Sequence, residues 1–547
     1  MSTLLKYWHT VRHLKPIQLY WRVQFHLARP RIHEGPAPPL RALLAQQWRS
    51  PARRNISWTG PGRANFLHET HDLDKIGWDG PAVEKLWRYH LHYFDDLNAH
   101  DAAQRREWHH SLLRRWVREN RPAEGTGWEP YPTSLRIVNW IKWALAGNRL
   151  PSECIQSLAV QARWLSKRLE IHLLGNHLLA NAKALVFAGS FFEGREADEW
   201  LARGLRILEC ELGEQVLPDG GHIERSPMYH SIVLEDLLDL LNLHSISPSL
   251  AGRWLNLGES CREAVGRMRH WLSVMCHPDG EISFFNDAAI GMAPSPQEVE
   301  LYAERLHLPS VPSPRDGLIH LPDSGYIRVQ RGTHAVVLLD VALVGPDFLP
   351  GHAHADTLSF ELSLYGQRVF VNSGTSCYGR SAERLRQRGT AAHNTVTVDG
   401  QDSSEVWAGF RVARRAKPLD LQIQEDGATL RVTCAHDGYV HLPGKPIHWR
   451  EWRVSDKSMD ITDVIKGSCR QTVGRLFFSP SIAVPASSTA TIGHATFSGH
   501  ALNWVIEGAT GRVVPARFHP EFGMSQATGC LEMVFLQARS CVRLAWG

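Results

Sequence analysis

The chain has 547 residues, a formal net charge of +4 and 43% hydrophobic residues. One hydrophobic core rarely serves so long a chain, so we expect two or more domains. The nearly balanced charge gives no reason to expect nucleic acid as the main partner, and the absence of any run of 18 apolar residues predicts no membrane span.

Residues 1–75 predict a mixed region, with a helix over 14–27 and proline-rich loops at 30–40 and 51–62. Basic residues are spread through the first 31 positions, which lack the apolar core of a secretory leader. The cytoplasm is therefore the expected compartment, although a periplasmic or extracellular location stays open. Nine scattered cysteines without a CxxC pair indicate reduced thiols.

From about residue 81 to 306 the pattern is helical throughout. Candidate helices cover residues 82–99, 103–118, 133–145, 154–168, 172–192, 196–212, 227–243, 250–275 and 297–305. Helices that follow one another without strands predict hairpins packed on each other.

A segment with three prolines, residues 307–317, breaks the helical pattern and predicts a domain boundary. After it, short stretches alternate with period 2, at 325–330, 335–340, 358–364, 368–371, 395–398, 430–433, 447–454 and 534–536. Many short strands joined by turns, such as the hairpin turn at Tyr365-Gly366-Gln367, predict an antiparallel sandwich. The sequence thus predicts an extension over 1–75, a helical domain over 76–312 and a β domain over 313–547, with a site in the cleft between the two domains.

The segment 350–362 places His352, His354 and Asp356 two residues apart, just before an apolar alternation. On a strand, residues of that spacing share one face, so they are expected to converge on one point at the mouth of a sheet. Such a cluster suits a metal or a proton-transfer centre. A buried, hydrogen-bonded histidine pair is the alternative for an isolated His-x-His.

A second cluster interrupts an otherwise apolar helix over 172–187 with Asn176, His177 and Asn181. A buried polar group without a partner costs about 1–3 kcal/mol, so these side chains have partners in the protein or in a ligand.

A third cluster surrounds a predicted helix start, where Ser226 suits the N-cap and Pro227 the first helical position. Tyr229 then lies in the first turn, where the helix dipole and Arg225 are expected to lower the phenol pKa. The alternative is that Tyr229 only caps the helix end.

Three further segments have polar character. His393 precedes another strand, and residues 279–287 form an acidic loop that suits a structural role. The basic run of Arg380, Arg384, Arg386 and Arg388 suits either an anionic substrate or a solvated face.

In chain order, these motifs resemble the heparinase II/III-like polysaccharide lyases. The matching segments are Trp87–Phe94, Trp128–Arg136, Gly175–His177, Glu224–His230, Gly351–Asp356, Gly374–Thr375 and His393–Thr395. The resemblance implies an incomplete (α/α) toroid followed by an antiparallel β-sandwich, in agreement with the boundary drawn from the pattern.

The resemblance also implies β-elimination at a uronic acid of an acidic polysaccharide, whether heparan-like, alginate-like or a bacterial exopolysaccharide. The reaction must neutralise the C5 carboxylate, remove the C5 proton and protonate the leaving O4. By resemblance, Asn176 and His177 neutralise the carboxylate, Tyr229 is the acid and, for syn elimination, the base, and His352 is a second candidate base. We further expect the substrate to contact Arg225, Arg136, His230 and Glu224.

Some members of the family hold a structural zinc, and the matching ligand positions here are His354, Asn372 and His393. Asn372 stands where those relatives have an aspartate, and a neutral amide oxygen is a poorer zinc ligand. A turn at Gly366 also pairs Asn372 near Phe360 rather than His354. The zinc expectation therefore stays open, and no organic cofactor is expected.

Three other functions remain as alternatives. The first is a non-catalytic protein that binds acidic glycans or assists exopolysaccharide assembly on the same scaffold. The second is a metal-dependent hydrolase built on His352 and His354, against which the helical first half argues. The third is a glycoside hydrolase, which needs a carboxylate pair such as Glu224 and Asp287.

Overall fold

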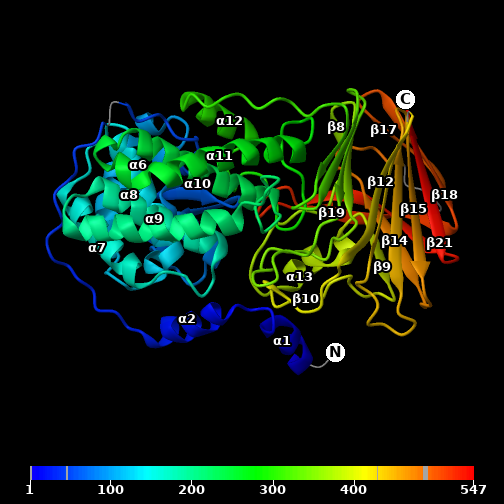
Figure 1. Cartoon of the computed structure of the whole chain (residues 1–547), viewed down its shortest axis with the longest axis horizontal. Helices are drawn as coiled ribbons and strands as arrows, with labels where there is room; N and C mark the ends of the chain where they lie inside the picture. Colours follow the sequence, from blue (N-terminus) through cyan, green and yellow to red (C-terminus); the bar gives the residue numbers. More distant parts are fainter. Residues whose placement is uncertain (1–2, 45–46, 428, 485–490) are drawn as a thin grey trace.

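The computed structural model describes residues 3–44, 47–427, 429–484 and 491–547. Two bodies lie side by side along the molecule, a helical one built from the first half of the chain and a β body built from the second (Figure 1). The N-terminal arm, with α1 (Thr3–Val11) and α2 (Pro16–Leu27), runs beneath both bodies in this view.

The helix predicted at 14–27 is present as α2, whereas the region predicted as a loop at 51–62 contains the start of a small sheet. This antiparallel sheet comprises β1 (Trp58–Gly60), β2 (Arg63–Phe66) and β3 (Glu69–Asp72), followed by α3 (Leu73–Ile76). Its strands are too short to show a period of two, and they form because they pair with one another while Trp58 and Phe66 are buried against the helical body.

The helical body follows the predicted order closely. Its α-helices are α4 (Lys85–Tyr93), α5 (Arg106–Glu119), α6 (Pro130–Leu145), α7 (Ser152–Lys167), α8 (Gly175–Phe191), α9 (Arg195–Gln215), α10 (Pro227–Ser245), α11 (Ala251–Met275) and α12 (Pro296–Arg305). The helix predicted over 82–99 is wrong in extent: Phe94 has a φ of 61°, which ends α4 and starts the short 3-10 helix Asp95–Asn98. The pairs α8–α9 and α10–α11 pack as antiparallel hairpins, and α6 packs against both α4 and α8, so that the helices surround one apolar core.

In the described residues of the β body, three antiparallel sheets have four or more strands. Their strands are β4 (Gly317–Leu321), β5 (Tyr326–Arg331), β6 (Ala335–Asp340), β7 (Phe360–Leu364), β8 (Gln367–Phe370), β9 (Val396–Val398), β12 (Pro418–Asp426), β13 (Thr429–His436), β14 (Ile447–Val454), β15 (Ser458–Lys466), β16 (Thr472–Phe477), β17 (Ile492–Phe497), β18 (His500–Glu507), β19 (Ala509–Phe518), β20 (Gln526–Phe535) and β21 (Arg539–Trp546). One sheet has the order β4-β5-β6-β7-β8, the second β19-β20-β16-β9 and the third β12-β13-β14-β15-β21-β18-β17. A separate ribbon pairs β10 (Val406–Trp407) with β11 (Arg411–Val412), and α13 (Ala382–Arg388) lies beside it.

The seven-stranded sheet packs face to face on the other two, which a bridge between Phe370 and Phe478 joins into one layer. Side chains from all three sheets form the apolar core of this sandwich. The predicted hairpin turn is confirmed, because Tyr365 and Gly366 link β7 and β8 with positive φ angles of 49° and 84°.

The molecule is therefore a helical N-terminal body followed by an antiparallel, sheet-rich C-terminal body, as the sequence predicts. In the part of the chain that the structure describes, no helix has the length and apolar character needed to cross a bilayer.

Candidate active site

Asp287 lies at the junction of the two bodies, in the segment between α11 and α12, and its carboxylate is completely buried. Three side chains of the β body converge on it. His352 Nδ1 lies 2.8 Å from Oδ2, His354 Nε2 lies 2.8 Å from Oδ1, and the Arg384 guanidinium donates to both oxygens, with 2.6 Å between Nη2 and Oδ2. One carboxylate therefore holds two histidines and an arginine in place.

The charge of Asp287 is stabilised by these partners. Burial alone raises the pKa of a carboxyl group, but the charge of Arg384 and the bonds from His352 and His354 hold the pKa of Asp287 well below its ordinary value. An ionised carboxylate can only accept hydrogen bonds, so each histidine presents a ring N–H to it. For His352 this leaves Nε2 as the atom available to other groups.

His352 was predicted to share a strand face with His354 and Asp356, and this conformation is wrong because residues 350–359 form an irregular segment before β7. The two histidines nonetheless converge, on Asp287. The His352 ring stacks on Tyr229 with 3.8 Å between ring centroids, and its Nε2 lies 3.7 Å from Glu224 Oε2. The imidazole thus stands between a phenol and a carboxyl group.

Tyr229 is positioned by the start of α10, as predicted. Ser226 is the N-cap and accepts a hydrogen bond from the Tyr229 backbone N–H, while Pro227 occupies the first helical position. The Ser226 hydroxyl also donates to the backbone carbonyl of Asp287, which ties the helix start to the centre of the site. The Tyr229 hydroxyl lies 2.8 Å from the hydroxyl of Tyr378, a residue of the β body.

The expected lowering of the Tyr229 pKa is wrong. Burial, followed by the nearby Tyr378 and Asp287, raises the pKa of Tyr229 well above its ordinary value. The Arg225 guanidinium cannot offset this, because it donates instead to the backbone carbonyls of Ser324 and Asp323. Tyr229 is accordingly protonated, a state that suits an acid.

Asn176 lies at the start of α8, beside Glu224. Its backbone N–H and its side-chain Nδ2 lie 3.4 and 3.1 Å from Glu224 Oε1, and its Oδ1 is buried without a hydrogen-bond partner among the described residues. Gly175, with a φ of 58°, allows this approach, since a Cβ there would lie 2.9 Å from Glu224 Oε1 and 2.2 Å from Leu349. Burial raises the pKa of Glu224.

His177 follows on the same helix and is only partly buried. Its Nδ1 lies 3.2 Å from Glu170, and its ring packs on Tyr131 at 4.5 Å between centroids. Burial alone lowers a histidine pKa, but the charge of Glu170 outweighs it and raises the pKa of His177 above 6.5. Asn181, one turn on, bonds to Glu170 at two points and so holds the carboxylate that faces His177.

Three residues expected to contact substrate point their polar groups into the protein. The Arg136 guanidinium is fully buried, donates to Gln161 and to the Gly127 carbonyl, and lies over the Trp116 ring. Arg225 bonds to backbone carbonyls at the junction of the two bodies. His230 Nε2 bonds to the Met268 carbonyl, while its Nδ1 accepts from a backbone N–H.

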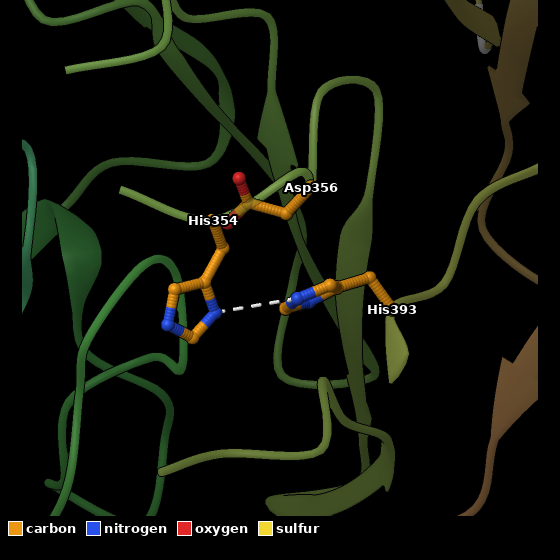
Figure 2. Close-up of side chains that lie close together, drawn as sticks. All are labelled: His354, Asp356 and His393. Carbon is orange, nitrogen blue, oxygen red and sulfur yellow. Dashed lines mark hydrogen bonds between the residues drawn. The ribbon is translucent and has the colours of Figure 1, made fainter. Parts of the chain in front are cut away.

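A cluster of metal-ligand type lies next to Asp287, made of His354, Asp356 and His393 (Figure 2). Their ligand atoms all lie within 4.8 Å of one another, and His354 Nδ1 faces His393 Nε2 at 3.3 Å. Two imidazole nitrogens bound at about 2.0–2.1 Å to one tetrahedral zinc lie about 3.3–3.4 Å apart. The remaining His354 nitrogen bonds to a carboxylate, which is the usual support for a metal-bound histidine. These side chains fit a zinc ion.

The carboxylate in this cluster is that of Asp356, whereas the sequence predicts Asn372 as the third ligand. The Asn372 amide is engaged elsewhere: its Oδ1 accepts from the Asn394 backbone N–H at 3.2 Å and its Nδ2 donates to Ser359 at 3.4 Å. The register explains this placement, since Leu362 pairs with Phe370 and Asn372 therefore lies near the start of β7.

Sequence reasoning did not assign three members of the site to the lyase reaction. Asp287 was placed in a structural loop and, with Glu224, in the glycoside hydrolase alternative. Arg384 was placed in a basic run that suits substrate or solvent, and Tyr378 was not considered. Arg384 and Arg388 are in fact fully buried, the latter bonded to the Ala353 carbonyl. The opposite charges of the acidic loop (279–287) and of the basic run (380–388) were the available signal. Nothing in the sequence, however, shows that two segments about 100 positions apart lie together.

The chain matches two family models, described as "Heparinase II/III N-terminus" over residues 76–304 and "Heparinase II/III-like, C-terminal" over residues 313–541. Among solved structures, that of Heparinase III superposes with a TM-score of 0.70 at 17% identity, covering 97% of this chain and 91% of that chain. This likeness shows the fold.

Two curated relatives bear different names. Heparin-sulfate lyase of Bacteroides stercoris is 28% identical over 260 residues, which cover 42% of this chain and 38% of that protein. FtsZ-localized protein C of Caulobacter vibrioides (strain NA1000 / CB15N) is 26% identical over 300 residues, which cover 53% of this chain and 48% of that protein. The matched part thus spans less than half the length of these relatives.

Proposed function

Because the chain belongs to the heparinase II/III-like family, we propose that it is a polysaccharide lyase that cleaves an acidic, uronate-containing polysaccharide by β-elimination. The observation that supports this most directly is the stacked pair of Tyr229 and His352, 3.8 Å apart between ring centroids and contributed by different bodies. Asn176, Glu224 and His177 lie beside it on the helical side.

The C5 carboxylate of the uronate must first be neutralised, so that the adjacent proton becomes acidic. His177, whose pKa Glu170 raises, supplies positive charge for this purpose. Asn176 supplies an amide, whose Nδ2 at present donates to the Glu224 carboxyl group, 3.1 Å from Oε1 and 3.4 Å from Oε2.

The orientation of that amide depends on Glu224. Burial raises the pKa of Glu224, and a protonated Glu224 donates a hydrogen bond to an amide oxygen. A half-turn of the Asn176 amide then places Oδ1 against Glu224 and Nδ2 where the unpartnered Oδ1 now lies. In that state the amide donates to the substrate carboxylate.

Proton transfer falls to the stacked pair. Tyr229 is protonated because burial raises its pKa, so it is the acid that donates to the departing O4. His352 has one ring nitrogen fixed on the ionised Asp287, so its Nε2 is the base that takes the C5 proton. Heparan-like glycosaminoglycans, alginate-like polyuronates and bacterial exopolysaccharides are the substrate classes to be compared.

This assignment is tested by the ultraviolet absorbance of the C4–C5 unsaturated uronate during incubation with a panel of uronate polysaccharides. Tyr229→Phe removes the acid and keeps the ring stack, so kcat/KM should fall about 10²–10⁴-fold. Tyr365→Phe, at the β7–β8 turn, is the matched control and should retain activity. Full activity of Tyr229→Phe would remove this residue from the mechanism.

We further propose that His354, Asp356 and His393 hold a structural zinc ion. Such an ion would fix the segment that contains His352 and so keep the base in place. The purified protein should contain about one zinc per chain, and a chelator should lower its melting temperature.

Substitutions distinguish Asp356 from Asn372 as the third zinc ligand. His393→Ala and Asp356→Asn should each abolish zinc retention, whereas Asn372→Ala and the exposed His494→Ala should retain it. A metal-free protein whose melting temperature does not respond to added zinc would contradict the proposal.

The alternative is a non-catalytic protein that binds acidic glycans or takes part in exopolysaccharide assembly. It is favoured by one observation, that a relative of similar identity and larger overlap is named FtsZ-localized protein C rather than a lyase. Binding of an acidic polysaccharide without any unsaturated product across the whole panel would establish it in place of the lyase.

A further inference from the structure

In the N-terminal arm, residues 3–33, many apolar side chains are exposed, which is unusual for helices that only pack against their own protein. A surface helix normally turns its apolar stripe toward the core and its polar side toward water. Here α1 and α2 contact the rest of the chain mainly through polar, basic and aromatic groups and turn apolar stripes outward.

The inward contacts of α1 involve Tyr7 and Thr10. The Tyr7 ring packs edge-on against Trp407 at 4.9 Å between centroids, and Thr10 Oγ1 accepts a hydrogen bond from the Trp407 ring nitrogen at 3.2 Å. Residues at this spacing occupy one side of the helix, which is therefore the side attached to the β10–β11 ribbon.

The inward contacts of α2 involve other residue types. Gln18 is buried and donates to the Phe348 carbonyl at 3.2 Å, and Lys15, just before the helix, pairs with Glu214. Phe25 packs on His172 at 4.3 Å between centroids. The arm is thus attached to both bodies, along the lower edge in Figure 1.

The exposed apolar residues of the two helices form what we call the apolar stripe. It comprises Leu4, Trp8 and Val11, on a side of α1 that adjoins its attached side, and Tyr20, Val23 and Leu27, on the side of α2 opposite Gln18 and Phe25. The spacing is i, i+4, i+7 on α1 and i, i+3, i+7 on α2, which aligns each set along one side of its helix. Leu4 is 82% exposed, Trp8 63%, Tyr20 59%, Val23 56% and Leu27 73%. Single exposed apolar residues are common, but rows of this size on two successive helices mark a surface for a partner.

The charged residues of the arm itself have one sign, although Asp347 and Glu214 of the rest of the chain lie beside His13 and Lys15. Residues 1–33 contain six lysines and arginines and neither aspartate nor glutamate. Arg12, Arg29 and Arg31 are exposed, and among the described residues no carboxylate lies within ion-pair distance of them. A partner for this surface is therefore expected to have both an apolar region and negatively charged groups.

We propose that the N-terminal arm docks on an anionic lipid bilayer, with the apolar stripe in the boundary between headgroups and acyl chains. Trp and Tyr rings suit that boundary, because they pair an apolar body with a polar edge. The exposed arginines of the arm attract the phosphates of anionic lipids, and the two signals together give stable peripheral binding where one alone is marginal.

A second copy of this chain fits the surface less well. A two-fold interface brings the same patch of both copies together, so the exposed Arg12, Arg29 and Arg31 of one copy would face those of the other without any carboxylate from the arm to offset them. A bilayer that contains anionic lipids has no such conflict.

The test is co-sedimentation of the full chain with vesicles of phosphatidylcholine alone or with about one third phosphatidylglycerol. The chain should sediment with the anionic vesicles and be released by high salt. The triple variant Trp8→Ser, Tyr20→Ser, Leu27→Ser should lower the partition coefficient at least about tenfold, and so should Arg12→Gln, Arg29→Gln, Arg31→Gln.

Matched controls use apolar residues of similar exposure on the β body. Ile492→Ser with Leu536→Ser, at positions 75% and 72% exposed, should leave vesicle binding unchanged. Failure to sediment with either vesicle would overturn the proposal. So would a concentration-dependent dimer in sedimentation velocity that the triple apolar variant dissolves, because the stripe would then be a contact between copies.

Discussion

At the scale of the residue, the surroundings of each titratable side chain in the site determine whether it is protonated. Asp287 stays ionised because Arg384 and two histidines face it, whereas Tyr229 stays protonated because burial disfavours the phenolate. His177 differs from both, since it is partly exposed and has a carboxylate at 3.2 Å. It is the group whose charge is expected to change near neutral pH.

If His177 binds the substrate carboxylate as proposed, substrate binding depends on pH. Its pKa is raised above 6.5, so its positive charge is complete below pH 6.5 and is lost as pH rises through the raised value. The KM for an acidic polysaccharide should therefore rise over that upper range. His177→Gln should show a high KM at all pH values and lose this dependence, as measured by initial rates between about pH 5 and 9.

His172 is the control for this effect, because burial lowers its pKa to about 4 and it is already neutral in that range. His172→Gln should keep the pH dependence of KM. An unchanged pH profile in His177→Gln would show that His177 does not contact the substrate carboxylate.

At the scale of the element, the start of α10 links helix formation to the position of Tyr229, the proposed acid. Ser226 caps the helix through the Tyr229 N–H and donates to the buried Asp287 carbonyl. Ser226→Ala removes both bonds, so we expect a loss of about 1–2 kcal/mol in the free energy of unfolding. Because Tyr229 lies in that first turn, kcat should fall as well; thermal unfolding and initial rates measure the two effects.

A matched cap exists on α12, where Ser295 accepts a hydrogen bond from the Glu298 N–H at 3.2 Å. Ser295→Ala should cost comparable stability and leave kcat unchanged. If both variants lowered kcat equally, the effect would be one of global stability rather than of Tyr229 placement.

At the scale of the whole molecule, Asp287 joins the two bodies. It belongs to the segment that leaves the helical body, while Arg384, His352 and His354 belong to the β body. Asp287→Asn leaves Arg384 buried without a counter-charge, which costs about 3–5 kcal/mol. Calorimetry should show a lower melting temperature together with loss of activity.

A double variant separates stability from chemistry. Asp287→Asn with Arg384→Gln removes both buried charges, so it should regain part of the lost stability without regaining activity. A single variant that melts like the unmodified chain would show that this ion pair does not hold the bodies together.

The sequence by itself determined the order and type of most elements. Apolar periodicity is a local property, and it predicted the helices from about residue 81 to 306 and the change to strands after the proline-rich segment. The helix start at Ser226 and the β7–β8 turn at Tyr365 were predicted for the same reason, because each depends on a few adjacent residues. Ordered motifs also indicated the family.

Only the tertiary structure decided which charges meet. Arg384 bonds to Asp287 across 97 positions, and Tyr229 to Tyr378 across 149. Burial then set the direction of each pKa, which raised that of Tyr229 where local reasoning predicted a lower value. Desolvation and long-range pairing depend on what the fold packs around a side chain, and a linear sequence does not contain that information.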